Sequence, residues 1–290
     1  MAPMSSAPCR LCASAGLSVH FAIGEHVLDR CSACGFVQVR EQPSQSALRA
    51  LYADGYFKRG KYDEEFAQKK EGERRLQLLE RARVNPGGRV LDAGCATGDF
   101  LSLGSQRYEM WGLDVSAYAT EVAAHKNPGC SGRIFTGFVE EQSFEPEFFD
   151  AIVMWDVVEH IWDPKSVLRR LVTHLRPGGS LILSTPDIGA LTARIMAKRW
   201  AFMTVPEHLG FFSPRSMRFL LETELGLDIT ESTTSGKWVN LGFLAYKLRR
   251  VFPQIPAALV AGVQRSPLAG APLYVPTADI RYVAAQKPRI

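Results

Sequence analysis

Residues Arg89–Phe100 read R-V-L-D-A-G-C-A-T-G-D-F, a short apolar run that ends at an aspartate and breaks into a glycine turn. The residues that follow, Asp99–Leu103, have the apolar spacing of a helix. A strand, a glycine turn and a helix in this order predict a nucleotide-type pocket at the carboxyl end of a parallel strand. Gly94 and Gly98 suit the turn, because a backbone without side chains can pass close to a ligand. The alternative is a tight strand-to-helix corner that binds nothing.

A second apolar run, Met110–Val115, contains Asp114 about 20 residues after the turn, where an acid can bind the hydroxyls of a ribose. The turn lacks G-x-G-x-x-G, which disfavours a dinucleotide and its pyrophosphate. It also lacks G-x-x-x-x-G-K-[ST], which excludes a phosphate-binding P-loop. The pattern therefore favours a nucleoside-bearing ligand without a phosphate chain.

The rest of the chain alternates between helix and strand signals. A continuous apolar run at Phe149–Trp155 predicts a strand that is buried on both faces. Asp163 and Pro164 predict a helix start, with an N-cap side chain followed by proline in the first turn. The same reasoning predicts further strands at 131–135, 181–186 and 227–232, helices at 116–126, 163–175 and 213–225, and a last strand at 280–285.

The glycine turn resembles motif I of the class I S-adenosylmethionine-dependent methyltransferases. The segments F-D-A-I (149–152) with V-E-H (158–160), and L-R-P-G-G-S-L-I-L-S-T-P (175–186), resemble motifs of the ubiquinone-biosynthesis-type, or methyltransferase 23-like, group. The resemblance covers essentially the full chain and is most specific between residues 89 and 186. It implies an α/β fold with a seven-stranded Rossmann-like sheet, whose seventh strand is antiparallel.

The resemblance also implies S-adenosylmethionine as the cofactor. Tyr56 is expected in a lid over it, although aromatic packing of the next helix on the sheet explains this residue equally well. Phe138 stands where relatives often have an acid for the adenine amine, so ring contact and backbone amides are expected there, with Glu140 as a displaced acid. The expected cofactor-binding residues are Tyr56, Asp92, Gly94, Thr97, Gly98, Asp114, Val115, Phe138, Trp155 and Asp156.

Four cysteines near the N-terminus form the pattern C-x₂-C-x₁₈-C-x₂-C. Two such pairs suit four thiolates around one structural zinc ion, whereas unrelated cysteines or a redox pair are the alternatives. The segment lacks a dense lysine and arginine cluster or interleaved aromatic residues, which favours a clamp on the catalytic domain or a wall of the substrate site over nucleic-acid binding. The expected ligands of this zinc ribbon are Cys9, Cys12, Cys31 and Cys34.

Methyl transfer from a sulfonium is an in-line displacement at carbon, in which the protein mainly positions donor and acceptor. A hydroxyl acceptor benefits from a base, and histidine suits this role near neutral pH. The two candidates are His208, in P-E-H-L-G-F-F-S after the fifth strand, and His160, just past the fourth. A structural histidine in an apolar stretch is the alternative for each. Lys237 and Trp238 are candidates for the lining of the acceptor pocket.

The composition is that of a globular protein, with 290 residues of which 46% are hydrophobic and 22% charged. The formal net charge of +4 is small, so nucleic acid is disfavoured as a partner. No run of about 18 apolar residues predicts a transmembrane helix, and the N-terminus lacks the pattern of a secretory signal. A cytoplasmic location with reduced cysteines is therefore expected.

Three regions are expected along the chain: a zinc ribbon at 1–45, a helical lid or linker at 46–85, and a methyltransferase domain at 86–290 with an insertion at about 236–272. The apolar and basic insertion is expected to cover the substrate cleft, with contact to a membrane surface as the less favoured alternative. The oligomeric state cannot be deduced from the sequence.

The predicted function is methyl transfer to a small molecule, preferably to a hydroxyl of a sugar, polyketide or similar metabolite. Three alternatives remain. They are an RNA methyltransferase that captures its substrate with the ribbon, a lipid or quinone O-methyltransferase, and a non-catalytic zinc-binding scaffold.

Overall fold

The computed structural model describes residues 7–44 and 65–289, which form two β-sheets and the helices around them. The larger sheet has seven strands in the order β10-β11-β8-β7-β4-β5-β6. The strands from β8 to β6 are parallel, and β11 is antiparallel to both β8 and β10, as predicted for the last strand. The bounds are β4 (Arg89–Ala93), β5 (Glu109–Asp114), β6 (Ile134–Thr136), β7 (Phe149–Trp155), β8 (Leu175–Pro186), β10 (Asp228–Asn240) and β11 (Pro272–Gln286).

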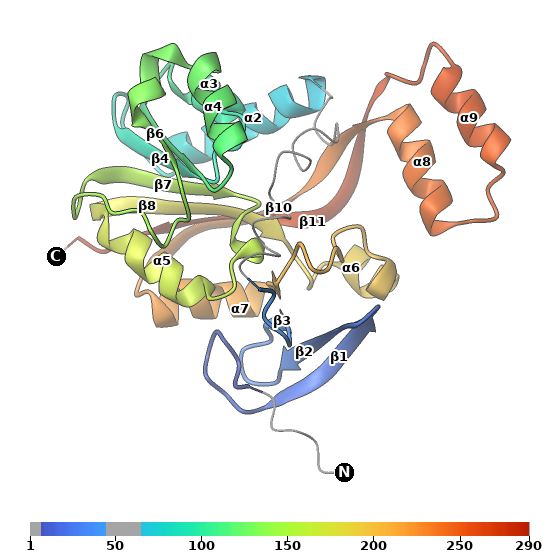
Figure 1. Cartoon of the computed structure of the whole chain (residues 1–290), viewed down its shortest axis with the longest axis horizontal. Coiled ribbons are helices and arrows are strands. Elements are labelled where there is room, and N and C mark those ends of the chain that lie inside the picture. The colour runs from blue at the N-terminus through green and yellow to red at the C-terminus, as the bar shows by residue number, and fades with distance from the viewer. Residues whose placement is uncertain (1–6, 45–64, 290) are drawn as a thin grey trace.

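Helices cover both faces of this sheet (Figure 1), because successive strand residues point to opposite sides. In β7, Ile152 and Met154 pack in one hydrophobic core, whereas Val153 and Trp155 pack in the other. The first core is covered by α5 (Pro164–Thr173), α7 (Pro214–Arg218) and the π-helix η5 (Phe219–Glu224), and the second by α2 (Glu65–Arg81), α3 (Asp99–Gly104) and α4 (Ala117–Lys126). The strand pattern thus produces the expected three-layer α/β fold.

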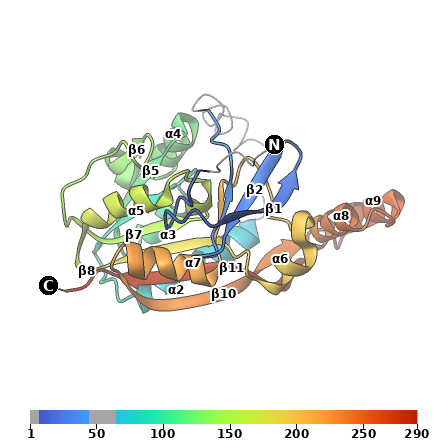
Figure 2. The ribbon, with the colours of Figure 1, turned by 90° about the horizontal axis from the view of Figure 1, so that it is seen from below.

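The N-terminal region forms the second sheet, in the order β1-β2-β3-β9. β1 (Leu17–Ile23) and β2 (His26–Cys31) form a hairpin, and β3 (Val37–Val39) pairs with β9 (Gly210–Phe211), which the segment after β8 contributes. Leu11 and Phe36 are fully buried in the same core as Phe212 and Met217. The N-terminal region therefore packs against the larger sheet and its helices, as Figure 2 shows.

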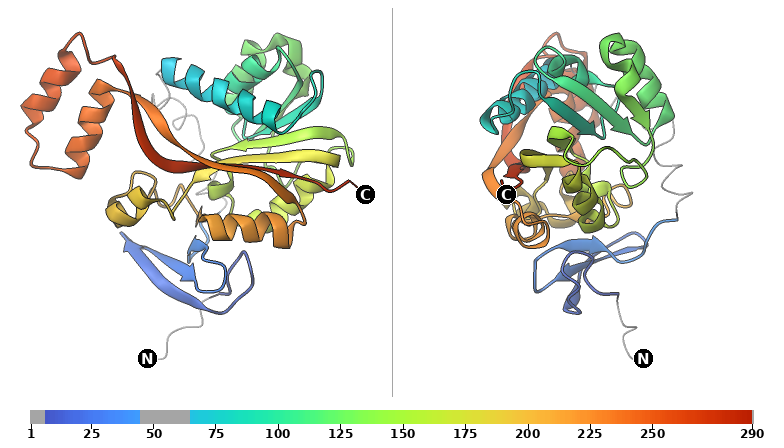
Figure 3. Two further views of the ribbon diagram at one scale, coloured as in Figure 1. Left: turned by 180° about the vertical axis from the view of Figure 1, so that it is seen from behind. Right: turned by 90° about the vertical axis from the view of Figure 1, so that its left-hand side faces the viewer.

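β10 and β11 extend beyond the larger sheet as a twisted two-stranded ribbon that carries α8 (Leu241–Val251) and α9 (Ala257–Arg265) at its end (Figure 3). The Asn240 side chain caps α8 by accepting a hydrogen bond from the Phe243 N–H. α8 packs on α9 and on β10. That this segment covers the substrate cleft stays a prediction.

Two local expectations are wrong. The strand expected at 131–135 begins only at Ile134, because the glycine-rich segment Pro128–Arg133 forms the 3₁₀ helix η2. The helix expected to reach Leu175 ends at Thr173. The segment 176–179, expected to separate this helix from the next strand, already belongs to β8. It can pair as a strand because the Gly178 N–H and the Gly179 carbonyl bond to the backbone of Lys287.

Three short helices complete the described ranges: η3 (Val158–His160), α6 (Leu191–Met196) and η4 (Ala197–Arg199). Within residues 7–44 and 65–289, we find no helix with the length and apolar character needed to span a membrane.

Candidate active site

The glycine turn between β4 and α3 lies at the carboxyl edge of the sheet, beside the ends of β5 and β7. Gly94 and Gly98 have φ angles of 97° and 77°, in the left-handed region that favours glycine. A Cβ on Gly94 would lie 2.3 Å from Cγ2 of Val157, and one on Gly98 would lie 2.6 Å from Nδ2 of Asn127. The packing of the protein itself therefore requires both glycines, whether or not a ligand approaches them.

Asp114 ends β5, one strand away from the turn, and its side chain is buried. Its Oδ2 accepts the Ala96 N–H at 2.9 Å, and its Oδ1 accepts the Ser116 N–H at 2.9 Å. Burial raises the pKa of Asp114 despite these bonds. Each carboxylate oxygen has a second lone pair, so Asp114 can hold the turn in place and still accept a ribose hydroxyl.

Asp92 is buried near the end of β4, and within the described part of the chain its Oδ1 has no hydrogen-bond partner. Burial raises the pKa of Asp92 to about 7, the charge of Arg75 on α2 lowers it, and Asp114 adds to the rise. An acid whose pKa is raised on folding keeps its proton in the native state while the unfolded chain has lost it. Stability is therefore lost as pH rises from the ordinary value of 3.8 to about 7.

Replacing Asp92 with asparagine is expected to stabilise the cofactor-free protein at pH 8 by on the order of 2–4 kcal/mol, which raises Tm by about 5–10 °C. The gain should shrink toward pH 5, where the native carboxyl group is already neutral. Thermal unfolding at both pH values measures this. Asp228→Asn, on the exposed start of β10, is the matched control and should change neither Tm. An equal gain at pH 5 and pH 8 would show that the effect is not electrostatic.

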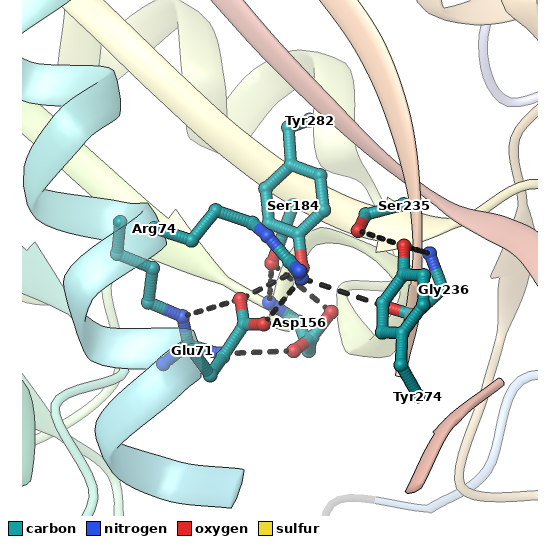
Figure 4. Close-up of polar contacts among 9 residues, drawn as sticks. Glu71, Arg74, Asp156, Ser184, Ser235, Gly236, Tyr274 and Tyr282 are labelled. Atoms are coloured by element: carbon teal, nitrogen blue, oxygen red, sulfur yellow. Dashed lines mark hydrogen bonds and ion pairs between the residues drawn. The ribbon is translucent and has the colours of Figure 1, made fainter. Parts of the chain in front are cut away.

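α2 brings a charged cluster to the end of β7 (Figure 4). Arg75 donates to Oδ2 of Asp156 at 3.2 Å and to Oε1 of Glu71 at 3.3 Å. The Ser184 hydroxyl donates to Oδ1 of Asp156 at 3.0 Å, and the Tyr282 hydroxyl donates to Oε1 of Glu71 at 2.7 Å. Both carboxylate oxygens of Asp156 are thus engaged, which fixes this side chain at the carboxyl edge of the sheet.

The two candidate histidines lie together beyond the end of β7, with ring centroids 4.8 Å apart and ring planes at 84°. Nδ1 of His160 lies 2.8 Å from the carbonyl oxygen of Glu207, and Nδ1 of His208 lies 2.8 Å from that of Phe202. Because a carbonyl oxygen only accepts, each Nδ1 carries the proton and donates it. In the neutral rings the basic nitrogen is therefore Nε2.

Glu159 joins this pair, with one potential ligand atom of each of the three residues within 4.8 Å of the others. Its Oε2 accepts from the Thr185 hydroxyl at 3.0 Å, whereas its buried Oε1 has no partner in the described ranges. Burial, together with the charge of Asp156, raises the pKa of Glu159 well above its ordinary value. The group therefore offers acid–base chemistry, and its atoms are also of the kinds that bind metal ions.

Arg10 ties the N-terminal region to the segment that carries His208. Its guanidinium donates to the carbonyl oxygen of Trp162 at 2.7 Å and to that of Leu209 at 2.6 Å. It also stacks on the Trp162 ring, with Cζ 3.6 Å from the centroid. Next to Leu209, β9 is paired with β3. These contacts attach the N-terminal region to the segment around His208, and its role as a clamp or as a wall of the substrate site stays a prediction.

The four N-terminal cysteines gather into one cluster, with all four sulfurs within 4.8 Å of one another. Sγ of Cys9 lies 3.6 Å from Sγ of Cys34, and Sγ of Cys12 lies 3.5 Å from Sγ of Cys31. Tetrahedral zinc with bonds of about 2.3 Å would separate its sulfurs by roughly 3.8 Å, whereas a disulfide needs about 2.05 Å. The residues present therefore fit a zinc ion.

Most of the remaining predicted cofactor residues surround the same edge of the sheet. The Thr97 hydroxyl donates to Asp99 at 3.0 Å on the rim of the glycine turn. Val115 directly follows β5, and Phe138 follows β6, the neighbour of β5. Tyr56 lies outside the described residues, so its role as a lid stays a prediction.

Trp155 is the exception, because its ring lies in the core below α2 and α3. It meets Phe100 edge to face at 5.3 Å, and Cζ of Arg75 lies 5.2 Å from its ring centroid. Its buried Nε1 has no hydrogen-bond partner in residues 7–44 and 65–289. Trp155 therefore lies at the carboxyl end of β7, but its ring belongs to the hydrophobic core.

The family model described as a methyltransferase domain matches residues 62–232. The chain belongs to the methyltransferase family. This methyltransferase is 34% identical over 178 residues to a ubiquinone biosynthesis O-methyltransferase of Xanthomonas campestris pv. campestris, an alignment that covers 57% of this chain and 74% of the relative. It is 28% identical over 183 residues to the protein of that name from Vibrio parahaemolyticus, covering 60% and 77% of the two chains.

A solved structure of a SAM dependent methyltransferase from Archaeoglobus fulgidus shares the fold, with a TM-score of 0.50 and 19% identity over 76% of this chain and 94% of that one. This methyltransferase is an S-adenosylmethionine-dependent enzyme, as its motifs predicted. The alternative of a non-catalytic scaffold is set aside by the family assignment.

Sequence reasoning missed three residues of the site, namely Glu71, Arg75 and Glu159. The segment E-G-E-R-R (71–75) gave a signal, because residues three and four apart lie on one face of a helix. This spacing predicts only a charged helix, and nothing in the local sequence indicates that this face of α2 meets the end of β7.

Proposed function

We propose that this methyltransferase transfers the methyl group of S-adenosylmethionine to a hydroxyl group of a small molecule, with His208 as the base. The observation that carries the proposal is the His160–His208 pair, which lies past the end of β7 on the same edge of the sheet as the glycine turn and Asp114. Donor and acceptor must meet at such an edge, because ligands of open α/β sheets bind at the carboxyl ends of the strands.

The proposed cofactor seat consists of the glycine turn and the polar ends of the neighbouring strands. One buried atom there, Oδ1 of Asp92, has no partner in the described ranges, and buried polar atoms normally have one. A polar ligand would supply such a partner. The residues proposed to hold the cofactor are Asp92, Gly94, Thr97, Gly98, Asp114, Val115, Phe138, Trp155 and Asp156, with Tyr56 as a candidate lid residue.

The cofactor supplies an activated methyl group, and the residues of this chain supply positioning and proton transfer. In the proposed reaction Nε2 of His208 accepts the hydroxyl proton while the acceptor oxygen bonds to the methyl carbon and the carbon–sulfur bond breaks in line. The Phe202 carbonyl holds the tautomer that leaves Nε2 as the base. His160 is proposed to share this proton, because its ring centroid lies 4.8 Å from that of His208.

Two classes of hydroxyl acceptor are proposed. A hydroxyl of a sugar, polyketide or similar metabolite is the class predicted from the sequence. A quinone-type acceptor is the second, favoured by the relatives whose names specify O-methylation in ubiquinone biosynthesis.

Methylation of matched acceptors tests the proposal. The zinc-containing protein would be incubated with S-adenosylmethionine labelled in the methyl group and with catechols, sugars and their amino analogues. Label is expected in an ether, with one S-adenosylhomocysteine formed per methyl group transferred. Label that appears only on nitrogen or carbon would contradict oxygen as the acceptor.

We also propose that Cys9, Cys12, Cys31 and Cys34 bind one structural zinc ion. Four thiolates complete a tetrahedral site, so the proposed zinc ion has no open coordination position and takes no part in the reaction. Its proposed contribution is to lock the N-terminal region, whose Arg10 and β3 hold the chain on the C-terminal side of His208.

Cys31→Ser is therefore expected to abolish stoichiometric zinc binding and to lower Tm by more than about 10 °C, because the N-terminal region shares a core with the larger sheet. Zinc content by elemental analysis and Tm by calorimetry measure both effects. Cys130→Ser, at a buried cysteine outside the cluster, is the matched control and should keep one zinc ion per chain. Full zinc content in the Cys31 variant would refute the site.

A further inference from the structure

Lys237 occupies an unusual position for a lysine. It lies on β10, its side chain is partly buried, and its Nζ stands 3.5 Å from the ring centroid of Phe202. Within residues 7–44 and 65–289, no carboxylate lies within ion-pair distance of this ammonium group. A positive charge removed from water without a counter-ion is costly, so lysines in such positions commonly have a purpose beyond packing.

A β-bulge in β10 directly precedes Lys237. The register of the β10–β11 pair shifts between Ser235 and Lys237, at Gly236. A Cβ on Gly236 would lie 2.1 Å from the carbonyl oxygen of Val275, so only glycine fits there. The Tyr274 hydroxyl accepts the Gly236 N–H at 3.0 Å. Figure 4 shows Gly236 beside the cluster that contains Asp156, where its carbonyl oxygen accepts from Arg74 at 3.5 Å. Lys237 is the next residue of β10.

The ring under the ammonium group connects Lys237 to the proposed base. Phe202 and His208 lie 6.3 Å apart with planes at 25°, and the Phe202 carbonyl accepts from Nδ1 of His208 at 2.8 Å. Lys237 thus contacts the ring of Phe202, and this ring in turn stacks on the ring of His208. An acceptor whose hydroxyl faces His208 would lie along Phe202 and extend toward Lys237.

The nearby carboxylates are already engaged by other donors. Asp279 on β11 accepts from Trp200 Nε1 at 2.9 Å and from the Thr277 hydroxyl. Asp156 accepts from Arg75 and Ser184. Burial lowers the pKa of Lys237 to about 8, Asp279 and Asp156 oppose this, and Lys247 on α8 adds to the lowering. In the described part of the chain, the ammonium group is therefore charged at neutral pH and contacts the Phe202 ring, but it has no carboxylate as a direct partner.

We infer that the ammonium group of Lys237 binds an anionic group of the acceptor, a carboxylate or a phosphate, and so selects acidic hydroxy compounds as substrates. The inference rests on the proposed function and adds the charge of the acceptor to it. A neutral acceptor would leave the partly buried ammonium group without a counter-ion, whereas an anion would form a charge-assisted hydrogen bond with it.

Binding of matched probes in the presence of S-adenosylhomocysteine tests this inference. The probes are 3,4-dihydroxybenzoate, its neutral amide and inorganic phosphate, titrated by calorimetry. The parent is expected to bind the benzoate at least about tenfold more tightly than the amide. Lys237→Met should remove this preference by weakening benzoate alone, and Lys237→Arg should restore it. Lys198→Met, at an exposed lysine of η4, is the matched control and should behave as the parent.

The pH profile separates a direct contact from a structural role. Because the ammonium form is required, affinity for the benzoate should fall about tenfold between pH 7 and pH 9 in the parent, as follows from a pKa of about 8. The Lys237→Arg variant should show a flat profile over this range, since arginine stays charged. Phosphate binding without benzoate binding would identify the anion as phosphate.

Several outcomes would overturn the inference. One is that the parent binds neither acidic probe, and another is that it binds the benzoate and the amide equally well. A third such outcome is a loss of S-adenosylhomocysteine affinity in Lys237→Met that equals the loss of benzoate affinity, which would assign the lysine to the cofactor carboxylate. If S-adenosylhomocysteine binds normally and only the acid preference is absent, the inference alone fails. If the parent does not bind S-adenosylhomocysteine, the proposed function itself fails.

Discussion

Replacing Asp114 with alanine is expected to weaken S-adenosylhomocysteine binding by about 100-fold, because hydrogen bonds to a charged group contribute roughly 1.5–3 kcal/mol each. The carboxylate is proposed to accept a ribose hydroxyl, and it already accepts the Ala96 and Ser116 N–H groups. Its removal therefore eliminates the hydrogen bond to the ribose and the two backbone hydrogen bonds that hold the glycine turn. Calorimetric titration measures the loss.

The matched variants separate these two contributions. Asp114→Asn keeps one acceptor oxygen but turns an amide toward one of the two N–H groups, so an intermediate loss of about tenfold is expected. Asp228→Ala removes an exposed carboxylate at the start of β10 and should bind as the parent does. Parent-like affinity in Asp114→Ala would show that the ribose does not lie at the end of β5.

Replacing His208 with alanine is expected to lower kcat by about 10²–10⁴-fold, the usual contribution of a positioned general base. Affinity for S-adenosylhomocysteine should change little, because His208 is proposed to face the acceptor and not the cofactor. Single-turnover methylation and calorimetric titration measure the two quantities separately.

Two further histidine variants give this prediction its controls. His125→Ala, at the exposed end of α4, should leave kcat unchanged. His160→Ala should lower kcat by a smaller factor, since the neighbouring ring is proposed only to share the proton. If His160→Ala were the more damaging change, the roles of the two histidines would be reversed. If neither variant slowed turnover, both would be structural.

The elements with strong local signals could be predicted from the sequence alone. The continuous apolar run Phe149–Trp155 is strand β7 with the same bounds, because a strand buried on both faces needs no polar alternation. Ser116, Asp163 and Ser213 cap their helices as expected, because each places a side-chain oxygen near an unpaired helix N–H. The four cysteines meet because each C-x₂-C pair is local and the β1–β2 hairpin brings the two pairs together.

Features that depend on distant contacts could not be predicted. The segment Arg176–Gly179 reads as a turn, yet it pairs as a strand because the last residues of the chain lie beside it. Arg75 is part of a charged helix face in the sequence, and only the packing of α2 on the sheet brings it to Asp156. The contact between His160 and His208 likewise depends on the path of the whole segment after β8, which the N-terminal region holds in place.

Calorimetric titration of the purified, zinc-containing protein with S-adenosylhomocysteine tests whether the glycine turn binds the cofactor. One molecule is expected to bind per chain with a Kd in the micromolar range, a binding free energy on the order of −8 kcal/mol. The absence of a binding isotherm at millimolar ligand would contradict the cofactor seat at the glycine turn and with it the proposed reaction.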